Sequence, residues 1–166
     1  MARSTKVLVV LILSCSLLCG CSMLPDALDP IVLTVDDLTI TMPGYYENYV
    51  TELIETETGG YFVYGYSEIT ITGLRDSYEV FDQVPTLEGY ANKLIQDNEI
   101  TAEVEMVDGL TTFTYRQLQN SDSYTYITAV YAGTESFWMV TAGCKTLNFD
   151  AIKDKLVDIL KTVVVA

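Results

Sequence analysis

The chain has 166 residues, of which 49% are hydrophobic, 23 are acidic and 9 are basic, and it contains no histidine. Its formal charge of −14 excludes the basic surface that a nucleic-acid partner requires. The absence of histidine excludes Ser-His and Cys-His nucleophile pairs and imidazole-bound zinc. A chain of this length favours a single domain, and its apolar fraction is too high for a disordered protein.

Residues 1–20 have the pattern of a secretory signal peptide. Arg3 and Lys6 precede an unbroken apolar run at residues 7–13. Such a signal combines a positive start, an apolar stretch of about 7–15 residues and small residues at the cleavage point. A membrane-spanning helix needs about 20 apolar residues, and this stretch ends by Leu18. We therefore predict secretion rather than a spanning helix.

The end of this signal, Leu18-Cys19-Gly20-Cys21, resembles the lipobox of bacterial lipoproteins. In that family the cysteine after the small residue receives a diacylglyceryl thioether, carries acyl chains such as palmitate, and becomes the new N-terminus. Cys19 departs from the pattern, because alanine, serine or threonine is usual there. The resemblance implies lipidation at Cys21 and anchoring in the cell membrane on its extracytoplasmic face. The alternative is an ordinary signal peptide in which the cysteines occur by chance.

Residues 21–37 are expected to form an acidic tether. Prolines and aspartates interrupt any hydrophobic period there, a composition typical of an extended spacer. Cleavage would remove two cations and no acid with residues 1–20, so the charge would fall from −14 to −16, and anionic headgroups would repel the domain. We place the folded domain at residues 38–166. Residues 31–35 can alternatively pair with a sheet edge, which leaves the boundary open between Pro30 and Asp37.

From residue 38 onward, strand and helix patterns alternate. Residues 38–42 alternate apolar with polar side chains and stop at Pro43-Gly44, and a β-rich run at residues 69–72 is expected to end at Gly73. Residues 86–98 have a helical apolar period, with Thr86 as the N-cap. Asp108-Gly109 predicts a tight hairpin turn. Further strands are expected at residues 49–56, 61–66, 103–107, 110–118, 124–131 and 137–144, and a second helix at residues 149–163.

Strands joined by hairpins, with two helices at separate points, predict an α+β fold in which helices cover an antiparallel sheet as an α/β/α sandwich. The order of elements is similar to that of the PsbP-like superfamily. The resemblance covers residues 38–165 and depends on Ile40-Thr41-Met42-Pro43-Gly44-Tyr45, residues 87–95 and residues 107–144. Its members include photosystem extrinsic subunits, a Ran-binding import factor and many small bacterial lipoproteins. They are mostly non-catalytic, so the resemblance implies a binding or assembly role and supplies no catalytic residues.

No combination of residue types in the sequence indicates catalysis or a metal centre. Among the 23 carboxylates, no pair stands out as the acid and nucleophile of a glycosidase, and no segment has the spacing of a calcium loop. Solvated surface is the simpler interpretation of these acids. Weak cation binding is an alternative for the aspartates of the tether and for the turn at residues 120–122. We expect no enzyme activity, no cofactor and no metal site.

Cys144 is the cysteine that stays free after processing and lipidation. On alternating strand geometry it shares a face with Trp138, Val140 and Ala142, which predicts a buried apolar side chain. The alternatives are nucleophilic or redox chemistry and disulfide-linked dimerisation. Activation of the thiol would then depend on a nearby cation, and Lys145 is the sole neighbour in sequence.

Tyrosine is unusually frequent, with 12 residues against 5 phenylalanines and 1 tryptophan. Tyr45, Tyr46 and Tyr49 cluster after the Pro43-Gly44 turn, where side chains can be exposed. Tyrosine suits recognition of peptides, sugars or proteins, and it is also a good strand former that packs within sheets. We predict these three as the binding surface of a non-enzymatic protein that binds, or assists, another envelope component. The rival prediction is an extracytoplasmic binding protein for a sugar, peptide or cation.

Overall fold

A computed structural model describes residues 29–44, 47–48, 54–56, 59–66 and 69–166. Within these ranges the chain forms two antiparallel sheets, two α-helices and one short 3-10 helix at Tyr78–Val80. No helix in these ranges is long and apolar enough to cross a membrane.

The larger sheet, as described, has eight strands in the order β3-β5-β6-β10-β9-β8-β7, with β4 paired to β5. Most neighbours in this order are also neighbours along the chain, as expected for strands joined by hairpins. The bounds are β3 Glu47–Asn48, β4 Ile54–Thr56, β5 Gly59–Tyr66, β6 Ile69–Ser77, β7 Glu105–Val107, β8 Leu110–Gln119, β9 Asp122–Ala132 and β10 Ser136–Lys145.

The smaller sheet has the order β1-β2-β11, with β1 at Ile31–Val35, β2 at Leu38–Met42 and β11 at Val164–Val165. The pairing of β1 with β2 confirms the alternative in which residues 31–35 join a sheet, although they fall within the expected tether range 21–37. The C-terminal strand β11 was not predicted, because two residues are too few to display a period.

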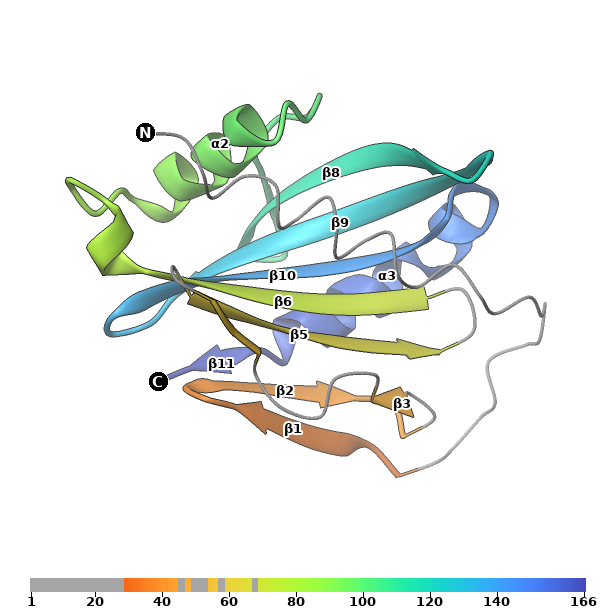
Figure 1. The fold of residues 1–166 in the computed structure, drawn as a ribbon. Helices are drawn as coiled ribbons and strands as arrows, with labels where there is room; N and C mark the ends of the chain where they lie inside the picture. Colours follow the sequence, from red (N-terminus) through yellow and green to blue (C-terminus); the bar gives the residue numbers. More distant parts are fainter. Residues whose placement is uncertain (1–28, 45–46, 49–53, 57–58, 67–68) are drawn as a thin grey trace.

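The two helices confirm the periods read from the sequence. Helix α2 spans Leu87–Asp97, and its predicted N-cap Thr86 accepts a hydrogen bond from the Gly89 N–H at 3.1 Å. Helix α3 spans Thr146–Lys161 and buries an apolar face. Both helices pack on the larger sheet, from opposite sides (Figure 1).

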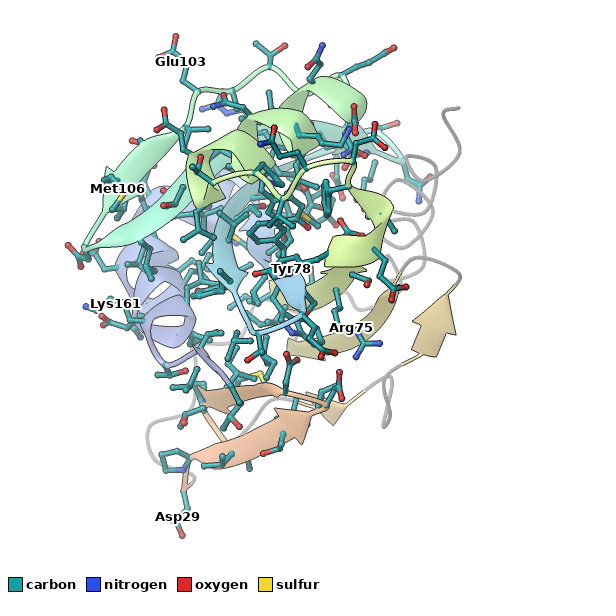
Figure 2. The ribbon with its side chains drawn as sticks, turned by 90° about the vertical axis from the view of Figure 1, so that its left-hand side faces the viewer. Asp29, Arg75, Tyr78, Glu103, Met106 and Lys161 are labelled. Atoms are coloured by element: carbon teal, nitrogen blue, oxygen red, sulfur yellow. The ribbon has the colours of Figure 1, made fainter. Side chains whose placement is uncertain are left out.

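The alternation of side chains along β10 separates two cores. Phe137 and Met139 pack beneath α2, whereas Trp138 and Val140 pack against α3 and the smaller sheet. Figure 2, turned by 90°, shows the same order of layers: α2, then the larger sheet, then α3 together with the smaller sheet. The predicted α+β sandwich is therefore confirmed, with a small sheet sharing the second cover layer.

The turn between β1 and β2 ties the smaller sheet to the larger one. Asp36 forms an ion pair with Arg75 of β6. Asp37 accepts a hydrogen bond from the Trp138 indole N–H at 2.6 Å, and its backbone carbonyl accepts one from the Ala166 N–H at 2.9 Å. These two aspartates, considered from sequence as weak cation ligands, instead bond to neighbouring parts of the fold.

The predicted strand end at Gly73 is wrong. Gly73 lies in the middle of β6, opposite Val140 of β10 and Phe62 of β5. Because strands flank β6 on both sides, the ladder hydrogen bonds carry the strand through the glycine to Ser77. Pairing with β5 and β10 therefore outweighed the tendency of glycine to end a strand.

Candidate functional site

The candidate site lies along the part of β8 that has a neighbouring strand on one side only. β7 pairs with β8 only opposite Leu110–Thr112, whereas β9 pairs with β8 along residues 111–119. The register with β9 is consecutive throughout, without a bulge. In the described part of the chain, one edge of β8 is therefore open from Phe113 to Gln119.

Two tight turns determine which backbone groups face this open edge. Residues 108–109 and 120–121 all have φ between 48° and 86°, as in two-residue hairpin turns whose flanking residues exchange both N–H···O=C bonds. Since these bonds alternate along a strand, the backbone of Thr112 faces β7, and the backbones of Thr114 and Arg116 face the same side. The turns thus aim the N–H and C=O groups of Thr114 and Arg116 out of the sheet.

A groove of about 720 Å³ follows this edge. Residues 98–101, at the end of α2, form one wall, and Phe149 and Asp150 in the first turns of α3 form the other. Residues 114–117 of β8 and Thr125 of β9 form the floor between them. The groove therefore extends around the open edge from one face of the sheet to the other. Figure 2 labels Met106 of β7, the short strand that ends the larger sheet beside β8.

Four buried side-chain polar atoms have no hydrogen-bond partner among the described residues, and all four belong to residues that line the groove. Buried polar atoms in folded proteins are nearly always paired, and leaving one unpaired costs about 1–3 kcal/mol. Their concentration at one place indicates a site shaped to receive hydrogen bonds from a bound molecule. The four atoms are Asn98 Oδ1, Thr114 Oγ1, Tyr115 OH and Gln117 Oε1.

The end of α2 fixes the first of these atoms. The Asn98 side-chain amide donates to the Leu94 carbonyl at 2.8 Å, which holds its Oδ1 in place. Glu99 then adopts φ 54°, and the Ile100 N–H closes the helix by donating to the Ile95 carbonyl at 2.9 Å. A helix ending of this αL type is common and turns the chain sharply. Here it places residues 98–101 beside β8.

An aromatic row fixes Tyr115. Its ring stacks between Phe113, at a centroid distance of 6.0 Å, and Tyr126, at 5.2 Å. Tyr126 in turn lies over Gly143, where any Cβ would collide with the ring. Burial is the main cause that raises the pKa of the Tyr115 phenol far above its usual value, while a weak interaction with the Thr128 hydroxyl lowers it. The hydroxyl therefore stays protonated and acts as a donor or acceptor of hydrogen bonds rather than as a base.

The groove carries three charged side chains, Glu99, Arg116 and Asp150, whose charges sum to −1. None of them forms an ion pair with another residue in the described ranges. Arg116 is exposed at the open edge. These charges are available to a ligand.

The groups best suited to covalent or acid–base chemistry lie elsewhere. Cys144 is 1% exposed on the face of Trp138, as predicted, and its thiol donates to the Lys145 carbonyl at 3.4 Å. Burial raises the pKa of the Asp76 carboxyl, which accepts a hydrogen bond from Tyr90 OH at 2.8 Å. Neither residue lines the groove. Across the described ranges, no three His, Cys, Asp or Glu side chains are grouped so as to hold a metal ion.

The site residues predicted from sequence all lie outside the described residues: Cys21, Tyr45, Tyr46 and Tyr49. They stay predictions. The groove is built from residues that sequence analysis did not select. One signal was present, because the expected strand at residues 103–107 is much shorter than its partner at residues 110–118 and leaves part of that partner's edge uncovered.

Comparison with known proteins establishes the fold alone. No family model and no curated protein sequence matches the chain. Cyanobacterial PsbP (CyanoP) from Synechocystis has a TM-score of 0.55 at 12% identity, covering 87% of this chain and 98% of that one. The yeast Ran-binding protein Mog1p has a TM-score of 0.55 at 10% identity, covering 84% and 96% respectively. The α+β fold is therefore PsbP-like, as the order of elements predicted.

A third structure, a protein from Bacteroides thetaiotaomicron, has a TM-score of 0.51 at 7% identity. The match covers 78% of this chain but only 45% of the Bacteroides protein. The fold can therefore stand as one part of a longer chain.

Proposed function

We propose that this protein is a lipid-anchored, non-enzymatic binding protein of the cell envelope that holds its ligand, or a component it helps to assemble, in the groove along β8. One observation carries the proposal: within the described ranges, the four unpartnered buried polar atoms all belong to residues that line one groove. A fold that retains several unpaired buried atoms loses stability at each of them. A ligand that supplies the missing hydrogen bonds would recover that loss.

The chemistry of the groove supports binding rather than catalysis. Its side chains offer amide, hydroxyl, guanidinium and carboxylate groups, the two carboxylates lie on opposite walls, and its one tyrosine is held protonated by the raised pKa of the buried phenol. A general base or nucleophile needs a group poised to lose or share a proton near neutral pH. Asp76 and Cys144, the stronger candidates for that role, lie away from the groove.

The sequence supports the envelope location. The signal at residues 1–20 would direct export, and the lipobox ending at Cys21 would place acyl chains at the mature N-terminus. Two or more acyl chains hold a protein stably on a bilayer, since each buried methylene contributes about 0.8 kcal/mol. The first described strand, β1, begins at Ile31, ten positions after Cys21.

The volume of the groove also favours a second candidate, a small-molecule binding protein. Sites for small molecules usually measure roughly 300–1,000 Å³, and the groove falls within that range. A sugar could use the same amide and hydroxyl groups. The two candidates differ in the chemical class of the ligand and share the location of the site.

Thermal unfolding of the full-length protein in detergent, with panels of peptides, oligosaccharides and cations, tests the binding function. A ligand at about 100 times its dissociation constant should stabilise the protein by about 2.7 kcal/mol. We expect Gln117→Ala to lose most of that shift. Gln119→Ala is the matched control, because Gln119 lies two residues further along the same face, bonds to Tyr126 OH at 2.8 Å and does not line the groove. Equal shifts in both variants would refute the groove as the site.

Anchoring is tested separately with the cysteines of the lipobox. Cys21→Ser should move the protein from the membrane fraction to the soluble fraction, and intact mass should show loss of the diacylglyceryl group. Cys19→Ser is the control, because it restores a residue usual at that position and should leave both properties unchanged. A Cys21→Ser protein that stays lipidated would disprove the assignment.

A further inference from the structure

We propose that the open edge of β8 accepts an extended segment of a partner polypeptide as an additional strand of the larger sheet. The inference rests on the proposed function, because it names the class of ligand that the groove would hold. A peptide that pairs with a sheet edge gains affinity from main-chain hydrogen bonds and specificity from alternate side chains. Both kinds of contact are available along β8.

The backbone of β8 offers free hydrogen-bonding groups at this edge. The N–H and C=O groups of Thr114 and Arg116 point out of the sheet and form no hydrogen bond with another described residue. β7 demonstrates that this edge pairs with a strand, since it bonds opposite Leu110 and Thr112 and then stops at Glu105. A new strand would continue the line of β7.

The open edge of β8 lacks the usual features that prevent an edge strand from pairing with another chain. Natural sheets protect their edges with prolines, bulges, lysines or a covering helix. The sequence of β8 contains no proline or lysine, and its register with β9 runs from Thr111 to Gln119 without a bulge. Arg116 provides the one charge within the strand. An edge of this length without a proline, lysine or bulge is suited to pairing.

The unpartnered atoms lie on both faces of the sheet at this edge. Tyr115 and Gln117 project to the side of α2, where Asn98 also lies, whereas Thr114 projects to the side of α3. An added strand directs successive side chains to these same two sides in turn. Polar side chains at successive positions of the segment would therefore meet the unpartnered atoms.

Charge and exposed apolar surface define the segment further. Glu99 and Asp150 flank the groove, and the whole chain carries −14, so a neutral or basic segment is favoured over an acidic one. Beyond the groove, Leu118 is 77% exposed and Leu147 is 95% exposed. We expect the segment to be polar where it fills the groove and apolar at the end that passes these leucines.

The probe is a set of synthetic eight-residue peptides that have threonine or asparagine at successive positions, valine at one end and one lysine, with glutamate in place of that lysine as the charge control. Amide hydrogen exchange of the full-length protein in detergent is measured with and without peptide. We expect exchange to slow by about tenfold or more at the Thr114 and Arg116 amides, which gain a partner. The Tyr115 and Gln117 amides, which already bond to β9, serve as internal controls and should change much less.

Backbone N-methylation of the peptide provides a second test that leaves the protein unchanged. Methylation removes one main-chain donor without altering any side chain. Methyl groups on donors that face β8 should weaken binding by about tenfold or more, whereas those on the intervening residues should be tolerated, which gives a period of two. The glutamate peptide should bind more weakly than the lysine peptide.

The outcomes separate the two proposals. If an oligosaccharide or cation binds through Gln117 while the peptides do not, strand addition is wrong and the groove still functions as a binding site. If a peptide binds without the period of two, its side chains alone are recognised and strand addition is again wrong. If no class of ligand responds to the Gln117→Ala change, both proposals fail.

Discussion

Tyr131 and Tyr115 occupy opposite faces of the larger sheet and differ in one respect. Both are largely buried, and burial raises the pKa of both phenols far above the usual value. Tyr131 OH donates to the Leu160 carbonyl of α3 at 2.7 Å, whereas Tyr115 OH forms no close hydrogen bond among the described residues and has only a weaker interaction with the Thr128 hydroxyl. Tyr131 lies beneath α3 and the smaller sheet, and Tyr115 borders the groove. The same residue type is thus satisfied under a complete cover and unsatisfied at an open edge.

Other polar side chains on the side of the larger sheet that faces α2 do have hydrogen-bond partners. Away from the edge, Thr128 and Thr141 bond to each other at 2.8 Å in full burial, and Tyr90 OH donates to Asp76 at 2.8 Å. The unpartnered atoms are therefore a property of the β8 edge and not of one core. We conclude that the covered parts of the sheet supply stability, while the edge carries polar groups at a cost in stability.

Trp138→Ala should produce the largest loss of stability on the covered side. The indole is fully buried between the two sheets, and its N–H donates to Asp37 at 2.6 Å. Truncation of a buried aromatic to alanine typically costs about 3–5 kcal/mol, because it leaves a cavity in addition to the lost burial. Urea unfolding measures the change, and Trp138→Phe is the control with a smaller expected loss. A loss below about 1 kcal/mol would contradict the assignment of stability to this side.

Gly143→Ala tests the support of the aromatic row behind Tyr115. An added Cβ would collide with the Tyr126 ring, so either the ring or the strand must shift. Overpacking of this kind usually costs about 1–3 kcal/mol. In a Tyr126→Ala background the obstruction is absent, and the same glycine change should cost much less. Equal costs in both backgrounds, measured by urea unfolding, would show that Tyr126 does not depend on Gly143.

The sequence predicted the parts of this molecule that follow from local periodicity. The apolar period at residues 86–98 identified α2, and Asp108-Gly109 identified the hairpin that begins β8. Alternation along β10 placed Cys144 on the buried face of Trp138. The strand end at Gly73 was wrong because pairing on both sides outweighed the local signal.

Predicting the groove would have required information that a single sequence lacks. Asn98 and Phe149 are distant along the chain, and they line one groove only because α2 ends, and α3 begins, beside β8. A polar atom can be called unpartnered only after every potential partner has been placed. Gln117 and Gln119 therefore look equivalent in sequence, although Gln119 donates to Tyr126 OH and the Gln117 Oε1 atom has no partner.

A pair of tyrosine-to-phenylalanine changes tests the central comparison directly. Tyr131→Phe removes a donor to the Leu160 carbonyl and should cost about 1 kcal/mol. Tyr115→Phe removes a hydroxyl that forms no close hydrogen bond and interacts only weakly with Thr128, so it should be nearly neutral. Chemical denaturation of the two variants under identical conditions gives the difference. If Tyr115→Phe destabilises as much as Tyr131→Phe, the Tyr115 hydroxyl is bonded in solution and the groove loses one of its four open positions.

The smallest expected effect is a change in the pH dependence of stability in Asp76→Asn. The test is specific, because asparagine retains an acceptor for Tyr90 OH. Burial is the main cause that raises the pKa of Asp76 above its ordinary value of 3.8, while Tyr90 and Lys93 lower it and Asp97 raises it further. The native state therefore holds the proton more tightly than the unfolded state. This contribution to stability is fully present below the unfolded pKa and is lost as pH rises through the folded pKa.

Asparagine cannot ionise, so Asp76→Asn should gain stability relative to the natural protein between about pH 4 and pH 7. Urea unfolding of both proteins at the two pH values measures the change. A constant difference between them would mean that the pKa of Asp76 is not raised in the native state. The hydrogen bond from Tyr90 and the charge of Lys93 would then offset the cost of burying the carboxylate.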